Sequence, residues 1–85
     1  MLQIVIQQGC EPCIHALLLA DRAASTFADV EVDVIDIDRD SERLPADVFA
    51  VPSFLIDGHL FSLGNPTWEE LAGALAERRH YDGDY

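Results

Sequence analysis

The chain has 85 residues and a formal charge of −11, with 16 acidic residues against five arginines and no lysine. A chain this short folds as one small domain, and its 49% hydrophobic content excludes a disordered chain. The negative charge repels phosphate backbones and anionic lipids, which disfavours nucleic acid and membranes as partners and favours a monomer. Because the charges are spread along the chain, solubility or a saline cytoplasm explains them as well as a basic partner does.

The longest nearly apolar run, residues 14–20, is too short to cross a bilayer. The N-terminus has no basic segment followed by an apolar one, so we expect no secretory leader. These features predict a cytoplasmic protein. In such a reducing compartment, two neighbouring cysteines are more often catalytic or metal-binding than structural.

The first predicted element is a strand at residues 2–7, where β-branched residues are frequent. Gly9 ends it, and residues 11–27 then favour a helix. Pro12 is tolerated there because a helix's first turn does not use its missing N–H. The helical spacing of apolar residues predicts a buried face made of Cys13, Leu17, Ala20, Ala24 and Phe27.

The middle of the chain predicts three further strands. Residues 30–37 alternate apolar and acidic side chains, which indicates a strand with one buried face. The polar residues 38–47 predict a loop with room for one helical turn. A β-hairpin follows, with strands at 53–56 and 59–63 joined by an Asp-Gly turn.

Thr67 followed by Glu70 forms a capping box that predicts a final helix at residues 68–79. Its predicted apolar stripe consists of Trp68, Leu71, Ala72, Leu75 and Ala76. We expect one domain at residues 1–79 and a frayed tail at residues 80–85.

The predicted order is therefore β-α-β-β-β-α, an α/β fold. The first helix is long enough to cross over between two parallel strands, whereas the hairpin strands are antiparallel. The expected closure is a four-stranded mixed sheet with a helix on each face.

Both cysteines of the chain fall in the motif Cys10-Glu11-Pro12-Cys13, between the first strand and the first helix. At a helix N-terminus, peptide N–H groups and the helix dipole favour the thiolate of the first cysteine. A thiolate attacks disulfides, and a second thiol resolves the mixed disulfide that results. Redox chemistry is therefore the leading interpretation.

The chain resembles the thioredoxin/glutaredoxin superfamily in its minimal form over residues 2–79. The resemblance rests on the strand–Gly–Cys-x-x-Cys–helix segment, on Val-Pro-Ser at residues 51–53 directly before the hairpin, and on Gly64 with the capped last helix. It implies a minimal thioredoxin-like fold.

The resemblance also implies roles for individual residues. Cys10 is then the exposed nucleophile and Cys13 the more buried resolving thiol. Pro52 is expected to be cis and to face the sulfurs, while the backbone of Val51 pairs with an extended substrate strand. Glu11 is a further candidate for substrate contact. No cofactor is implied beyond an external reductase, which places the protein in electron transport to protein disulfides.

The sequence also departs from its relatives. Gly9 replaces the aromatic residue that thioredoxins carry there, and Ile4 falls where they carry a buried acid, so Cys13 has no obvious internal base. The turn at residues 64–67 differs from the glutathione-binding turn of glutaredoxins, and no basic residue lies near Cys10 in the sequence. Glutathione is therefore disfavoured as a partner.

The effect of Glu11 is left open by the sequence. Its carboxylate opposes formation of the Cys10 thiolate, whereas the helix N-terminus promotes it. A solvated charge screened by salt explains Glu11 as well as a tuning role does. Asp36 and Asp38 resemble an acidic pair found in many relatives, and we expect them to cap the end of a strand and its loop.

Two functions other than redox chemistry remain as alternatives for this chain. One is a small Cu(I) or Zn carrier that binds metal through Cys10 and Cys13, with His15 nearby. A closed zinc site needs four ligands, and the chain has no second cysteine pair. We therefore expect no metal ligands and an exposed His15. The other alternative is an interaction module of the same fold without redox activity.

Overall fold

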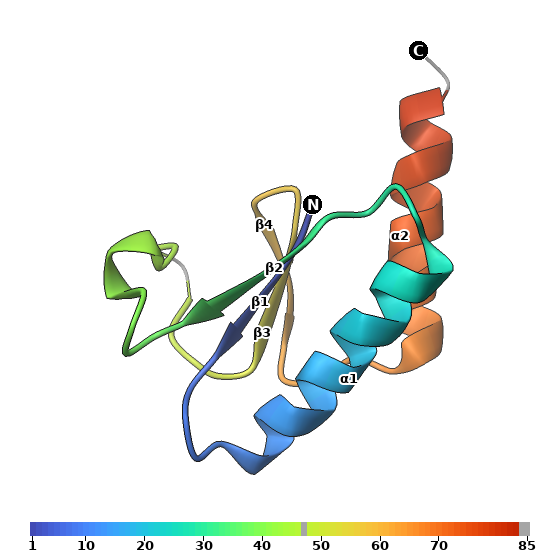
Figure 1. The fold of residues 1–85 in the computed structure, drawn as a ribbon. Coiled ribbons are helices and arrows are strands. Elements are labelled where there is room, and N and C mark those ends of the chain that lie inside the picture. Colours follow the sequence, from blue (N-terminus) through green and yellow to red (C-terminus); the bar gives the residue numbers. More distant parts are fainter. Residues whose placement is uncertain (47, 84–85) are drawn as a thin grey trace.

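The computed structural model describes the backbone of residues 1–46 and 48–83, with side chains described as far as residue 77. The elements are β1 (Leu2–Ile6), α1 (Glu11–Thr26), β2 (Val32–Asp36), the 3₁₀ helix η1 (Ser41–Arg43), β3 (Ser53–Ile56), β4 (His59–Leu63) and α2 (Trp68–Gly83), shown in Figure 1. This confirms the predicted order. The hairpin strands have the predicted bounds, whereas β1 and β2 are shorter than predicted.

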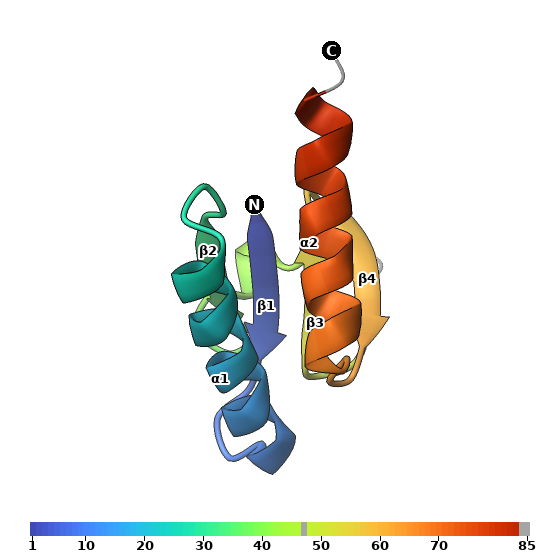
Figure 2. The same ribbon diagram turned by 90° about the vertical axis from the view of Figure 1, so that its right-hand side faces the viewer.

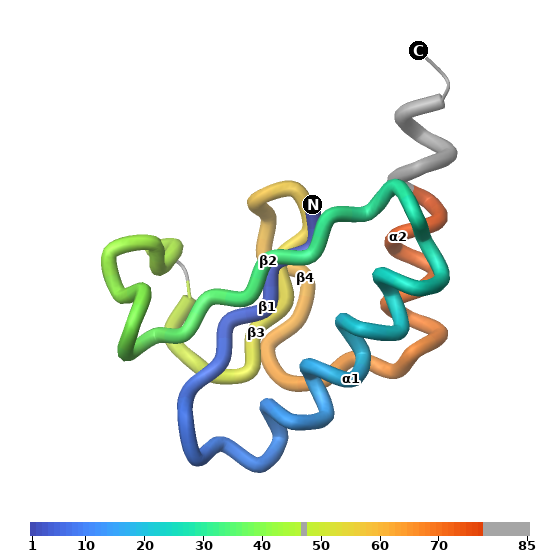
Figure 3. The backbone as a smooth tube through the Cα atoms, in the orientation of Figure 1, coloured from blue at the N-terminus to red at the C-terminus, as the bar shows by residue number. Residues whose placement is uncertain are grey.

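The four strands form one mixed sheet in the order β2-β1-β3-β4. β1 pairs in parallel with β2, from Leu2 opposite Val32 to Ile6 opposite Asp36. It pairs antiparallel with β3, which pairs antiparallel with β4. The parallel pair needs a crossover, which α1 supplies. β1 is thus a central strand, and the chain leaves its C-terminal end through a turn into α1, where the cysteine motif lies (Figure 3).

Both helices cover the same face of the sheet, so the prediction of a helix on each face is wrong (Figure 2). One core cluster joins buried side chains of α1 and α2 to Leu2, Ile4 and Phe54 of the sheet. The two helices also meet directly, because the guanidinium carbon of Arg22 in α1 lies 4.2 Å from the ring centroid of Trp68 in α2. The ring of Phe27, which follows α1, lies 6.5 Å from the same ring between centroids.

The second face of the sheet is covered by the loop between β2 and β3 instead of a helix. Its buried cluster consists of Val5, Ile35, Val48 and Leu55, with Ile37, Leu44 and Val51 packed against it. A face this small is closed by a few apolar side chains from a loop. The apolar pattern of the strands predicts that this face of the sheet is covered, but it does not indicate whether a helix or a loop covers it.

The buried face of α1 also differs from the prediction. It consists of Cys13, Ala16, Leu19, Ala20 and Ala23. Leu17 and Ala24, which were predicted to be buried, are exposed. Apolar residues occur on most sides of this helix, so more than one stripe fits helical spacing. The observed stripe is richer in alanine, whose small side chain lets a helix pack closely on a sheet.

The N-terminus of α2 confirms the predicted capping box. The N–H of Thr67 donates to Oε1 of Glu70 over 2.9 Å, and the N–H of Glu70 donates to Oγ1 of Thr67 over 3.1 Å. These reciprocal bonds satisfy two donors that the helix itself leaves unpaired.

Along α2, Leu71 and Leu75 are buried as predicted, but Ala76 is exposed. Ala76 follows Leu75 by one residue, about 100° around the helix axis, and so points away from the sheet. The helix ends at Gly83 instead of Arg79. Residues 84–85 of the tail that we expected to be frayed lie outside the described residues.

Candidate active site

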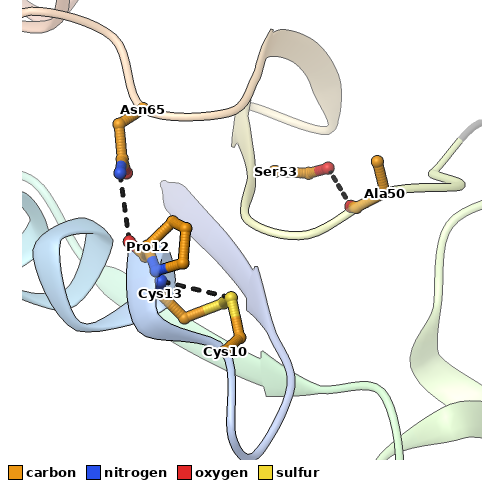
Figure 4. Close-up of a disulfide and its surroundings, with 6 residues drawn as sticks. All are labelled: Cys10, Pro12, Cys13, Ala50, Ser53 and Asn65. Atoms are coloured by element: carbon orange, nitrogen blue, oxygen red, sulfur yellow. Dashed lines mark hydrogen bonds between the residues drawn. A yellow bond between two sulfur atoms is a disulfide. The ribbon is translucent and has the colours of Figure 1, made fainter.

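The cysteine motif lies between the C-terminal end of β1 and the first turn of α1. Gly9 makes the turn with a φ of 80°, a conformation that L side chains rarely adopt. Cys10 is the N-cap of α1, and Cys13 lies in its first turn. A disulfide joins the two residues, whose Cα atoms are 5.3 Å apart (Figure 4).

The two cysteines differ in burial and in hydrogen bonding. Cys13 is only 3% exposed, whereas Cys10 is half-buried. The N–H of Cys13 donates to Sγ of Cys10 over 3.2 Å. The sulfur of Cys10 therefore lies where the N–H groups and dipole of α1 favour a negative charge. This arrangement suits Cys10 for attack and Cys13 for resolution.

A groove of about 290 Å³ opens beside the disulfide. Glu11, Ile14 and Leu17 line it together with the two cysteines, and these three side chains are exposed. Among the described residues that line it, the groove thus combines apolar contacts with the carboxylate of Glu11, and none of them is cationic. An anionic ligand would meet no complementary charge from these residues.

Val51 and Pro52, the predicted substrate-binding residues, lie in the segment that leads into β3. Pro52 is buried, Val51 is half-buried, and the peptide bond between them is cis, the isomer that the family resemblance implies. The hydroxyl of Ser53 donates to the carbonyl of Ala50 over 2.5 Å and closes this bend (Figure 4).

A second hollow, of about 230 Å³, adjoins the first at Gln7, which lines both. Phe49 and Val51 are among its other lining residues, and Phe49 is 80% exposed. Phe49 is not among the site residues predicted from the sequence. An aromatic residue directly before the Ala-Val-Pro segment was the available signal.

Two adjacent residues, Gly64 and Asn65, connect the proline segment to the cysteine motif. The N–H of Gly64 donates to the carbonyl of Pro52 over 2.7 Å, and Nδ2 of Asn65 donates to the carbonyl of Pro12 over 3.0 Å. Cys10, Glu11 and Cys13 line one groove. The hydrogen bonds of Gly64 and Asn65 link the proline segment to the cysteine motif beside that groove. The sequence predicts Asn65 only as part of a turn.

Asp36 caps the loop that follows β2, as predicted. Its side chain is nearly buried, and Oδ1 accepts the N–H of Asp38 over 2.9 Å and that of Arg39 over 3.3 Å. The hydrogen bond from Asp38 is the largest cause that lowers the pKa of Asp36 from 3.8, followed by smaller contributions from Arg39 and Gln8, while desolvation opposes the shift. Asp36 thus fixes the loop beside the site.

Among the described residues, the structure offers little that would hold a metal ion with several ligands. Within residues 1–46 and 48–77, no three His, Cys, Asp or Glu side chains are grouped closely enough to do so. His15 is exposed on α1, as expected. In the part of the chain that is described, no helix combines the length and apolar character needed to cross a membrane.

Comparisons with known proteins agree with this geometry. A family model described as thioredoxin domain matches residues 1–76. The chain belongs to this family. Its fold is similar to that of reduced glutaredoxin from Escherichia coli, with a TM-score of 0.58 and 20% sequence identity, over 89% of this chain and 93% of that one. A comparison with curated protein sequences finds no match.

The family match and the structural match confirm the resemblance to the thioredoxin/glutaredoxin superfamily. A thioredoxin-like fold that holds a Cys-x-x-Cys pair at disulfide distance supports a role of the thiol–disulfide oxidoreductase type.

Proposed function

We propose that the protein is a thiol–disulfide oxidoreductase that reduces or exchanges disulfides of protein substrates through Cys10 and Cys13. The observation that carries this proposal is the asymmetry of the two linked sulfurs. One belongs to an accessible N-cap residue that accepts a backbone hydrogen bond, and the other is buried in the first turn of the same helix.

The reaction begins with the reduced protein. The thiolate of Cys10 attacks a substrate disulfide, so that a new S–S bond forms while the substrate's S–S bond breaks and one substrate thiolate leaves. Cys13, once deprotonated, attacks the sulfur of Cys10 and expels the second substrate thiolate. Two electrons have then passed to the substrate, and the Cys10–Cys13 disulfide remains. An external dithiol reductase returns the electrons by the same exchange in reverse.

We assign substrate contact to Val51, Pro52 and Glu11. In this assignment the backbone of Val51 pairs with an extended substrate segment, and the exposed side chains of Ile14 and Phe49 supply apolar contacts on either side. The acidic surface favours encounter with basic substrates and disfavours glutathione, which is an anion. We place this electron transfer in the cytoplasm, a reducing compartment in which two neighbouring cysteines are more often catalytic or metal-binding than structural.

The different roles of Cys10 and Cys13 are tested by trapping the mixed disulfide with a substrate. A Cys13→Ser variant, mixed with two peptides joined by one disulfide, is expected to form a mixed disulfide at Cys10 and to release one peptide thiol. The buried Cys13 of a Cys10→Ser variant reacts at least about tenfold more slowly, because attack requires an accessible thiolate. Mass spectrometry of acid-quenched samples measures both adducts.

Equal adduct formation by the two variants would contradict the assigned roles, and absence of any adduct at Cys10 would contradict the proposed function. Circular dichroism of both variants checks that each is folded before the rates are compared.

A further inference from the structure

Two residues between β4 and α2 are hydrogen-bonded to the candidate site, one to the proline segment and the other to the cysteine motif. As described above, Gly64 donates to the carbonyl of Pro52 and the Asn65 side chain donates to the carbonyl of Pro12. Figure 4 shows Asn65 pointing from its own segment toward the cysteine motif. Asn65 is thus placed to act on the motif from outside helix α1.

The backbone that carries Asn65 is itself anchored. The carbonyl of Gly64, which belongs to the Gly64–Asn65 peptide, accepts the hydroxyl of Ser62 over 2.9 Å. Gly64 adopts a φ of 88°, which L side chains rarely reach, and Pro66, which follows Asn65, is buried. Asn65 therefore projects from a fixed segment and loses little backbone freedom when its side chain binds Pro12.

The atoms that Asn65 and Cys10 contact belong to one peptide group. Asn65 donates to the oxygen of the Pro12–Cys13 peptide, and the N–H of the same peptide donates to Sγ of Cys10. A donor on the oxygen of an amide polarises it and strengthens its N–H as a donor, by about 10–30% per bond in chains of hydrogen bonds. The N–H of Cys13 is shared between Sγ and the carbonyl oxygen of Cys10, at 3.2 Å from each, and a donor on the oxygen of the same peptide holds its plane in that orientation.

We propose that Asn65 is a positioning residue of the redox site, which stabilises the negative charge on Cys10 through the Pro12–Cys13 peptide. This inference rests on the proposed function, because the Cys10 thiolate is the species that attacks. Loss of the Asn65 donor should leave the thiolate less stable relative to the thiol. The reduced pair should then be less stable relative to the disulfide, so the disulfide becomes harder to reduce.

The test compares Asn65→Ala and Asn65→Asp with Thr67→Ala, which breaks the cap of α2 but leaves the Asn65–Pro12 bond in place. Alkylation of Cys10 by iodoacetamide is followed against pH in a Cys13→Ser background, where Cys10 is the sole cysteine. Glu11, the charged residue that lines the groove with Cys10, is unchanged throughout. The equilibrium of the intact pair with a dithiol buffer is measured in parallel.

For Asn65→Ala we expect alkylation near neutral pH to slow about threefold, the pH midpoint to rise, and the equilibrium constant for reduction to fall by a similar factor. Asn65→Asp, which keeps the shape but replaces the donor with a negative acceptor, should exceed that effect. Thr67→Ala should lower the melting temperature and leave both redox readouts unchanged.

The positioning role would be overturned if Asn65→Ala kept the wild-type alkylation rate and reduction equilibrium, or if Thr67→Ala shifted both as much as Asn65→Ala does. Either result would leave the proposed function intact, provided that the wild-type cysteine pair is reversibly reduced. A wild-type protein without any reversible thiol–disulfide equilibrium would instead overturn the proposed function, and the role of Asn65 with it.

Discussion

At the sulfur of Cys10, two neighbours act with opposite sign. The N–H of Cys13 and the N-terminus of α1 favour the thiolate, whereas the carboxylate of Glu11, which lines the same groove, disfavours it. The stabilisation by the helix N-terminus acts through a direct hydrogen bond from the N–H of Cys13. The repulsion from the Glu11 carboxylate acts through solvent, because Glu11 is exposed, so this repulsion should depend on ionic strength.

Replacing Glu11 with Gln should therefore speed alkylation of Cys10. An exposed charge pair in a water-like medium interacts by about 0.5 kcal/mol, which corresponds to roughly a twofold faster reaction at low salt. The gain should shrink as salt is added. Rates are measured near neutral pH in the Cys13→Ser background.

Glu31→Gln is the matched control for this measurement. It removes the same charge beside Leu2, at the opposite end of β1 from the motif. A Glu11→Gln rate equal to that of Glu31→Gln at low salt, or a slower one, would show that Glu11 does not act on the sulfur.

At the scale of elements, Asp36 organises the junction between β2 and its loop. Its pKa is lowered in the folded protein, mainly by the hydrogen bond from the N–H of Asp38, so the carboxylate form stabilises the fold. This contribution is fully present above the ordinary pKa of 3.8 and is lost as the pH falls through the lower folded value.

Asp36→Asn should therefore lower the melting temperature at neutral pH and reduce the acid sensitivity of the protein below about pH 4. Melting temperatures from neutral to acidic pH measure the effect. The control is Asp38→Asn, which changes an exposed carboxylate on the same loop. If the melting temperatures of the wild type and Asp36→Asn fell in parallel with pH, Asp36 would not be the group whose carboxylate form stabilises the fold.

At the scale of the whole molecule, the order of the elements and two of the three strand pairings could be predicted from local signals, whereas the antiparallel pairing of β1 with β3 was not predicted. Residues 30–37 alternate in hydrophobicity, an Asp-Gly turn marks the hairpin, and Thr67 with Glu70 marks a helix start. The cysteine motif could be placed at a helix N-terminus for the same reason, since Gly9 separates a strand from a helical pattern.

The placement of the helices could not be predicted in this way. Leu2 and Ile4 face the helices while Val5 faces the loop, so both faces of β1 are apolar and each only requires some cover. The contact between Asn65 and Pro12 spans 53 positions in the sequence, and no local pattern marks it. Tertiary packing decides such features, and packing depends on the whole chain.

The central claim is that Cys10 and Cys13 form a reversible redox couple. The most direct test is the equilibrium of the protein with a series of dithiol buffers, read by mass after rapid alkylation, with Cys10→Ser and Cys13→Ser alongside. We expect a reversible two-electron transition between roughly −180 and −280 mV, absent from both variants. No transition, or a thiol pair protected by bound metal as purified, would contradict the claim and favour a metal carrier.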